Sequence, residues 1–333
     1  MNITVAICCY NSGKVLDRTL QTLRAATPND LPVLVIDDGS TDDTASVAEK
    51  YGAQVIRHDV NQGYGWARQS ALQHCETEFI AYIDDSCLVS TDWYTYLVEL
   101  WRKADSNTHA IVGKMEIFEP QTYLQNFMDR HNPFLPLPIT FSRNNSIPKK
   151  LKAYLIGKVD IPACYISGFS NGNASFKKSS LDEIGGYDTR YRLGAEDEDI
   201  AARLQSRFGR NSIFYDPLLK VFHISSSSLK SLAVRNFRYG KSAAFRYRLE
   251  GGTPLILPIP AISAVITLTA LILLNIPLLA IALLLIAFAY LPRTKKYFFS
   301  DTSVIFLLEF MHLAGFCTQA LTKSPSRTER VLS

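Results

Sequence analysis

The chain has 333 residues, of which 47% are hydrophobic and 20% are charged, and this length allows one sizeable domain plus something smaller. Its formal net charge of +4 is too mild to support nucleic acid as a partner. The six cysteines include no CxxC pair with metal-like spacing, so we expect buried, reduced thiols rather than a disulfide framework or a zinc site.

Strand and helix signals alternate over residues 1–115. Apolar runs predict the strands, and helical patterns lie between them. The rhythm is typical of an α/β domain with a mostly parallel sheet, helices on both faces and right-handed crossovers. We expect Thr41 or Asp42 to cap the second helix. The predicted strands are 3–9, 33–36, 54–56, 79–83 and 110–112, and the predicted helices are 14–23, 42–50, 65–75 and 93–104.

The middle of the chain is less regular. Between residues 116 and 165 any long element is broken by Pro133, Pro136, Pro138 and Pro148, which predicts a loop-rich insertion over the carboxyl edge of the sheet. Order resumes with a Gly- and Asn-rich segment from residue 166. We then expect a helix from about 179, a helix over 197–208 and a strand over 212–215.

Two uncharged runs after residue 250 are the main membrane signal. Residues 255–274 are long enough to span a bilayer, whereas 278–291 is short for a full crossing. Both flanks are basic, so the positive-inside rule predicts a helical hairpin with its two ends in the cytoplasm. The amino terminus shows no signal peptide pattern. We therefore expect a cell-membrane protein whose first domain is cytoplasmic.

Two further stretches bear on the membrane. Between 230 and 248, six basic residues alternate with four aromatic ones, which favours contact with anionic lipid head groups, with a solvated helix face as the alternative. The stretch 304–321 carries Glu309 and His312, and we interpret it as an amphipathic interfacial helix rather than a third span. The predicted division is a catalytic domain (1–228), a basic juxtamembrane linker (229–253), a transmembrane hairpin (254–292) and a tail with an amphipathic helix (293–333).

Acidic clusters follow apolar runs at three places: Asp37-Asp38, Asp84-Asp85-Ser86 and 196–199. Carboxylates next to an apolar core are costly unless something positive or hydrogen-bonding meets them. In an open α/β sheet the carboxyl ends of the strands form the ligand crevice. The pattern therefore indicates a divalent cation, a polyhydroxylated substrate, or both.

The first strand is followed by Tyr10 and Asn11 instead of a GxGxxG turn, and no such fingerprint follows any strand. This removes the main support for a dinucleotide-binding dehydrogenase. An aromatic and an amide at a strand end can stack on a base and hydrogen-bond its edge. Asp38, after the second strand, could bind a ribose or a base N–H.

An ordered set of motifs makes residues 3–225 resemble family 2 glycosyltransferases of the GT-A fold. No single motif carries the resemblance, because each occurs widely by itself. The set comprises Tyr10-Asn11, Asp37-Asp38-Gly39-Ser40-Thr41-Asp42, Asn61-Gln62-Gly63 with Ala67-Arg68, Asp84-Asp85, Gly172-Asn173, Ile184-Gly185-Gly186-Tyr187-Asp188, and Glu196-Asp197-Glu198-Asp199-Ile200 with Arg203-Leu204.

The resemblance implies a role for each matching segment. It implies that Asp197 is the catalytic base, which takes a proton from an acceptor hydroxyl and gives inversion at the anomeric carbon. It implies a divalent cation, Mn²⁺ or Mg²⁺, on Asp84-Asp85-Ser86, which matches the family's DxD element, since hard oxygen ligands suit both ions. By the same resemblance the donor side comprises Tyr10, Asn11, Asp38, Arg68 and Asp84, the metal group Asp84, Asp85 and His223, and the acceptor or sugar side Gly172, Asn173 and Glu196.

Several of these residues have plainer readings. Ser86 stands where the family usually has a carboxylate, so the cation could be weakly held. The segment 37–42, when taken alone, is better explained as a turn with a helix cap. Glu198 and Asp199 suit the first turn of a helix through its dipole. Arg68 could reach a phosphate or pair with a sheet-edge acid, and His223 could be a metal ligand or an ordinary histidine after a strand.

The resemblance leads to a specific functional expectation. We expect inverting transfer of a sugar from a nucleotide sugar, UDP-linked, to a hydroxyl of a lipid-linked or other membrane-proximal glycan acceptor, in glycan or polysaccharide assembly. One alternative is a polyprenyl-phosphate glycosyl synthase, whose phosphate nucleophile needs no base. An alternative of another class is an inactive membrane subunit that binds sugar nucleotides, for which Ser86 is the best support.

Overall fold

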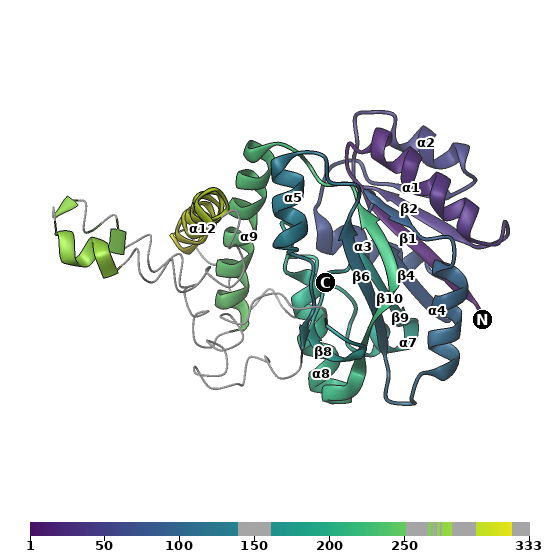
Figure 1. Ribbon diagram of the computed structural model, residues 1–333. Coiled ribbons are helices and arrows are strands. Elements are labelled where there is room, and N and C mark those ends of the chain that lie inside the picture. The colour runs from purple at the N-terminus through teal and green to yellow at the C-terminus, as the bar shows by residue number, and fades with distance from the viewer. Residues whose placement is uncertain are drawn as a thin grey trace. The chain divides into compact units, whose positions relative to one another are not determined.

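A computed structural model describes residues 1–138, 161–250, 298–321 and, between 266 and 281, residues 266–267, 269, 272–273 and 275–281 (Figure 1). The chain divides into two compact units. The described part of the first unit is 1–138, 161–192 and 196–225, and that of the second is 193–195 and the described residues from 226 onward. Each unit is treated by itself below.

The first unit is built on one mixed sheet. Its strands run in the order β3-β2-β1-β4-β9-β6-β10-β8-β7, and β5 pairs with β10. The first four strands of that order are mutually parallel, which confirms the predicted α/β rhythm. The strands are β1 (Ile3–Cys9), β2 (Val33–Asp37), β3 (Gln54–Arg57), β4 (Phe79–Ile83), β5 (Cys87–Val89), β6 (Ala110–Ile117), β7 (Leu137–Pro138), β8 (Cys164–Gly168), β9 (Asn173–Lys177) and β10 (Ile213–His223).

Helices cover both faces of this sheet (Figure 1), because its strands alternate apolar side chains to either side. In β4, for example, Ala81 belongs to the core under one set of helices and Ile80 to the core under the other. One face carries α1 (Gly13–Ala26), α2 (Thr44–Lys50) and α4 (Trp93–Lys103), and the other carries α3 (Tyr64–His74), α7 (Lys178–Glu183) and α8 (Glu196–Phe208).

Strand β9 lies antiparallel between β4 and β6 at the centre of the sheet. Its sequence belongs to the Gly- and Asn-rich segment that was not predicted as a strand. Antiparallel pairing sets Ile83 of β4 opposite Asn173, so the start of β9 lies beside the end of β4. Strand β10 then returns parallel to β6, with a register shift between Asp216 and Lys220. It extends well beyond the predicted strand over 212–215.

Two local predictions need correction. The N-cap of α2 is Asp43, and Asp42 instead accepts hydrogen bonds from the backbone and hydroxyl of Thr44. The predicted loop-rich insertion contains α5 (Tyr123–Arg130), which begins with a capping box formed by Thr122 and Gln125. Such a box satisfies otherwise unpaired N–H groups at a helix start. The rest of that insertion, residues 139–160, lies outside the described residues.

The second unit contains two long helices, α9 (Leu229–Glu250) and α12 (Phe298–Ala320). They pack closely, because a Cβ at Gly240 or Gly315 would collide with the backbone carbonyl of the facing helix. Within the described residues, one helical stretch, Ser303–Ala320, has the length and composition of a membrane span. Its apolar residues are not gathered on one face, so the expected amphipathic pattern is faint. The predicted hairpin over 254–292 lies mostly outside the described residues.

Candidate active site

The carboxyl ends of the parallel strands bring most of the predicted site residues to one edge of the sheet. Strand β1 pairs in parallel with both β2 and β4, so residues 10–12, 38–40 and 84–86 follow strands that end together. Strand β9 starts at this edge, and the Asp84 amide donates to the Gly172 carbonyl at 3.3 Å. This is the edge where open α/β sheets bind ligands.

Asn11 ties the first of these turns to the second. Its backbone has a φ of +51°, and its amide nitrogen donates to the Ser40 hydroxyl at 2.9 Å. Its side-chain oxygen accepts from the Thr41 amide at 2.8 Å. That oxygen therefore holds two loops together, whereas neighbouring Tyr10 is half exposed at the same edge.

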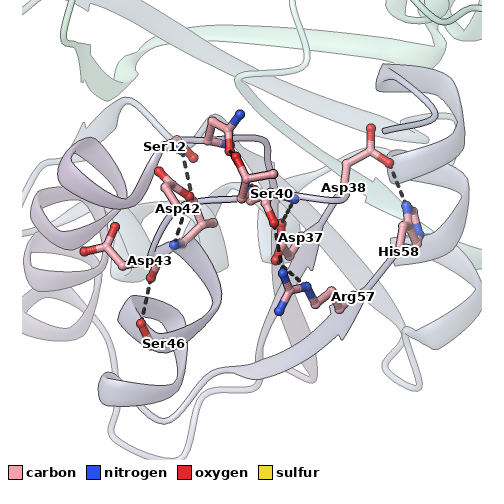
Figure 2. Close-up of polar contacts among 12 residues, drawn as sticks. Ser12, Asp37, Asp38, Ser40, Asp42, Asp43, Ser46, Arg57 and His58 are labelled. Atoms are coloured by element: carbon pink, nitrogen blue, oxygen red, sulfur yellow. Dashed lines mark hydrogen bonds and ion pairs between the residues drawn. The ribbon is translucent and has the colours of Figure 1, made fainter. Parts of the chain in front are cut away.

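Figure 2 shows the contacts of the two acids at the end of β2, Asp37 and Asp38. Buried Asp37 accepts from the Ser40 amide at 2.9 Å and faces Arg57 at 3.4 Å. Asp38, also buried, pairs with His58 Nδ1 at 2.7 Å. These contacts hold the loop after β2 in place. They also offset the cost of burying the two carboxylates.

The carboxylate of Asp38 also accepts from two backbone amides of the loop before α3. The Gln62 amide lies 3.0 Å from Oδ1, and the Gly63 amide lies 2.7 Å from Oδ2. With His58 these contacts occupy both oxygens, so a direct bond from Asp38 to a ribose or base would have to replace one of them. Asp38 is foremost the residue that fixes the 58–63 loop at the site.

Replacement of Asp38 by Asn should therefore destabilise the first unit. An amide offers one acceptor oxygen and would set its own N–H groups against an amide of Gln62 or Gly63. The expected loss is about 1–3 kcal/mol in the free energy of unfolding. Urea unfolding followed by tryptophan fluorescence measures it, since all three tryptophans lie in this unit. Asp43→Asn, at an exposed N-cap without a side-chain cap bond, is the matched control, and equal midpoints for the two variants would contradict the prediction.

The same loop is held from its other side by Arg192. The Arg192 guanidinium donates to the carbonyls of Gln62 and Asn61 at 3.0 and 2.9 Å. Gly63 has a φ of +94° and lies against the Arg192 backbone with no room for a Cβ. Sequence reasoning missed both His58 and Arg192, because nothing in the sequence near them marks a partner that lies far along the chain.

A single buried guanidinium joins the end of β4 to the start of α8. Arg68 Nη2 lies 3.2 Å from Asp84 Oδ1, and Nη1 contacts Glu196 Oε1. Its side chain is only 8% exposed, against 32% for that of Asp84. Of the two readings left open for Arg68, pairing with a sheet-edge acid is the one the structure displays. Burial opposes the charge of Arg68, but Glu196 and Asp84 together raise its pKa overall.

The start of α8 carries the other acids. Burial raises the pKa of Glu196 above its ordinary value, while Arg68 opposes that shift. Glu196 Oε2 is buried and has no hydrogen-bond partner among the described residues. Asp197, the next residue, is half-buried and accepts from the Glu198 amide at 2.8 Å. Asp199 pairs with Arg203 within the helix, as expected of a structural acid.

The residues of the DxD-like element, Asp84-Asp85-Ser86, differ in their surroundings. Burial, with a contribution from Asp84, raises the pKa of Asp85 to about 6. Ser86 lies 3.3 Å from His223 Nε2, and His223 Nδ1 lies 3.0 Å from the Ser225 hydroxyl. His223 is thus beside the element through Ser86, with both ring nitrogens near hydroxyl groups.

Asp84 and Asp85 suit a divalent cation that arrives with a diphosphate. Mg²⁺ in such sites is held by one or two carboxylates, with phosphate oxygens and water completing its shell. Among the described residues no three His, Cys, Asp or Glu side chains form a ready metal cluster. The predicted group of Asp84, Asp85 and His223 is therefore not preformed. The two acids suit the cation, and the contact that brings His223 beside this element is the one to Ser86.

Gly172 and Asn173 have different roles in the structure. A Cβ at Gly172 would lie 2.5 Å from Asp84 Oδ2, so glycine is needed for Asp84 to take its place. Asn173 is buried and accepts from Trp93 Nε1 at 3.0 Å. Its Nδ2 donates to the carbonyls of Lys114 and Leu219 at 3.2 and 2.9 Å. With its amide engaged inside the sheet, Asn173 does not face the sugar side that we expected for it.

Comparisons with known proteins agree on one family. A model described as Glycosyl transferase family 2 matches residues 4–185. The pre-mycofactocin glycosyltransferase of Mycobacterium tuberculosis is 24% identical over 246 residues, which cover 73% of this chain and 47% of that protein. The chain spans less than half of the length of such curated relatives.

Solved structures show the same fold at low sequence identity. The mannosyltransferase PcManGT from Pyrobaculum calidifontis, in complex with GDP-Man and Mn²⁺, aligns with a TM-score of 0.59 at 16% identity, over 96% of this chain and 87% of that one. TarS 1–349 of S. aureus, in complex with UDP, aligns with a TM-score of 0.50 at 16% identity, over 96% and 90% of the two chains.

Proposed function

Because the chain belongs to glycosyl transferase family 2 and is a glycosyltransferase of the GT-A fold, we propose that it transfers a sugar from a nucleotide-sugar donor to an acceptor hydroxyl with inversion. In this proposal the transfer depends on a divalent cation, and the acceptor is a lipid-linked or other membrane-proximal glycan. The donor nucleotide is UDP. We assign the product to glycan or polysaccharide assembly.

One observation carries the proposal. The Arg68 guanidinium contacts both Asp84, after β4, and Glu196, at the start of α8. The donor-side acid and the residue next to Asp197 therefore lie within the reach of one side chain. Inverting transfer needs such an arrangement, with the leaving diphosphate on one side of the sugar and a base on the other.

The donor side is formed by the loops that end β1, β2 and β4. Exposed Tyr10 is available to stack on a base, and Asp38 and Asn11 hold the loops beside it. Asp84 and Asp85 would hold the cation, which neutralises charge on the departing nucleoside diphosphate. The structural neighbours bind GDP-Man with Mn²⁺ in one case and UDP in the other, which supports a nucleotide-bound donor.

Asp197 is the proposed base. Its half-buried carboxylate can take the proton of an acceptor hydroxyl as that hydroxyl attacks the anomeric carbon. Glu196 is buried beside it and bound to Arg68, so it holds the start of α8 near the donor side. Gly172 leaves room for the Asp84 carboxylate, and on that ground we assign it to the sugar side of the site.

The second unit supports a membrane-proximal acceptor. Helix α9 carries basic residues along its length, including Arg238 and Lys241, and exposes Tyr239 and Tyr247. Stretches of this composition bind anionic lipid head groups. The apolar stretch Ser303–Ala320 has the length of a membrane span. We propose that these helices keep the catalytic unit at the cytoplasmic face of the cell membrane.

A donor screen tests the proposed function. Purified full-length protein should release nucleoside diphosphate from one or a few UDP- or GDP-sugars when Mn²⁺ is present, and lose this release in EDTA. Asp84→Asn should lower the release by about 10²-fold or more, because the cation loses a charged ligand. Asp92→Asn, an exposed acid at the N-cap of α4, should leave it unchanged. Tight UDP binding without release from any donor would instead support an inactive binding subunit.

A further inference from the structure

Arg68 is the buried positive charge between two acids of the site. It projects from α3 and reaches Asp84 and Glu196, which belong to segments 112 residues apart in the sequence. Tyr64, one turn earlier in α3, has its ring 5.8 Å from the guanidinium carbon. The Tyr82 hydroxyl donates to the Arg68 carbonyl at 3.0 Å, which anchors the helix turn that carries the side chain. The guanidinium is therefore held in place from several sides.

The two acids that share this guanidinium differ in their surroundings. Asp84 is one-third exposed and opens to the edge of the sheet, whereas Glu196 is buried. Glu196 Oε2 is buried without a hydrogen-bond partner among the described residues. Glu196 Oε1 already contacts Arg68, and a buried carboxylate oxygen without a partner is costly, so Oε2 can accept a second bond from the same guanidinium. Asp84 can exchange the same contact for a ligand from solvent.

We propose that Arg68 occupies Asp84 as an internal counter-ion when no donor is bound, and yields it to the divalent cation while remaining on Glu196. Arg68 is then a positioning residue that couples the donor side to the start of α8, next to Asp197. The inference depends on the proposed function only in that a divalent cation binds at Asp84. It predicts that Arg68 and the cation compete for one carboxylate, since both carry positive charge to the same oxygens.

Two substitutions should shift cation affinity in opposite directions, although neither residue is a proposed metal ligand. Arg68→Gln removes the competitor and should tighten Mn²⁺ binding in the absence of nucleotide. Glu196→Gln removes the second acid, leaves Arg68 wholly to Asp84, and should weaken Mn²⁺ binding. We expect a change on the order of fivefold or more in each direction, the usual size of such couplings. The readout is the signal of free Mn²⁺ in electron paramagnetic resonance, titrated with purified full-length protein.

Matched controls separate this effect from a general change in charge. Arg57→Gln removes an arginine at the same sheet edge, one that faces Asp37 and not Asp84, and should leave the Mn²⁺ affinity unchanged. Glu198→Gln removes an exposed acid in the first turn of α8 and should likewise leave the Mn²⁺ affinity unchanged. If Arg68→Gln does not fold, Arg68→Lys serves instead, because a lysine has a single nitrogen where the guanidinium uses one on each acid. A lysine held by buried Glu196 leaves Asp84 free and should also tighten Mn²⁺ binding relative to the wild type.

The outcomes distinguish this inference from the proposed function. Tighter binding in the Arg68 variant together with weaker binding in the Glu196 variant supports it. Equal affinities in the wild type and both variants, or shifts in the same direction, overturn it and leave glycosyl transfer untouched. A wild type that binds Mn²⁺ with this pattern but releases no nucleotide from any donor overturns the proposed function and leaves the competition standing.

Discussion

Asp197→Asn should abolish sugar transfer to a hydroxyl acceptor, with kcat lowered by about 10²–10⁴-fold. The substitution keeps the size of the side chain and its bond to the Glu198 amide, since the amide oxygen still accepts. It removes only the ability to take a proton. Nucleotide affinity should therefore stay near the wild-type value, because Asp197 is proposed as the base for the acceptor and not as a contact of the nucleotide. Product formation with the donor found in the screen, and calorimetric UDP binding, measure the two quantities.

Glu198→Gln is the control for this experiment. Glu198 is the neighbouring exposed acid of the same helix turn, so its loss changes the local charge without touching the proposed base. The same variant series separates two chemistries. A phosphate acceptor is already a nucleophile and would tolerate Asp197→Asn, so full activity of this variant would favour a polyprenyl-phosphate glycosyl synthase.

Asn173→Leu should cost about 3 kcal/mol or more in the free energy of unfolding. The amide of Asn173 satisfies one donor and two acceptors in the centre of the sheet, on Trp93, Lys114 and Leu219. A leucine of similar size would leave all three groups buried and unpaired, at about 1–3 kcal/mol for each. The urea midpoint, followed by tryptophan fluorescence, should fall far below that of the wild type.

Asn107→Ala, at an exposed position before β6, is expected to leave the urea midpoint unchanged. At temperatures where the Asn173 variant is folded, its KM for donor should stay close to the wild-type value. The opposite pattern, an unchanged midpoint with a strongly raised KM, would return Asn173 to the sugar side where the sequence resemblance placed it.

The fold of the first unit could be predicted because local patterns agree with it. The runs that form β1, β2 and β4 are apolar except for Thr4 and the terminal Asp37, as expected of strands buried on both faces. Each is followed by polar residues that cannot continue the strand, so the ligand edge could be located as well. Strand β9 has no such signal. Its sequence is mixed, and its place in the sheet depends on β4 and β6, which lie far away in the sequence.

The site residues were easier to find than to orient. Asp38 and Asn173 are at the edge where they were expected, yet their side chains bind backbone groups of distant segments. Whether a polar side chain meets a ligand or an amide depends on those segments, and one sequence does not reveal which loop comes near. For Arg68, two partners were equally plausible, and only the arrangement of β4 and α8 decides between them.

The antiparallel insertion of β9 also bears on how the protein emerges from the ribosome. The segments of β3, β2, β1 and β4 are all synthesised by residue 83, but β4 keeps an open edge until residues 173–177 arrive. Strand β6 is made in the meantime and finds its second neighbour only when β10 is complete at residue 223. Open strand edges invite pairing with other chains. The nascent protein is therefore most exposed to aggregation, and most in need of chaperones, during synthesis of roughly its middle third.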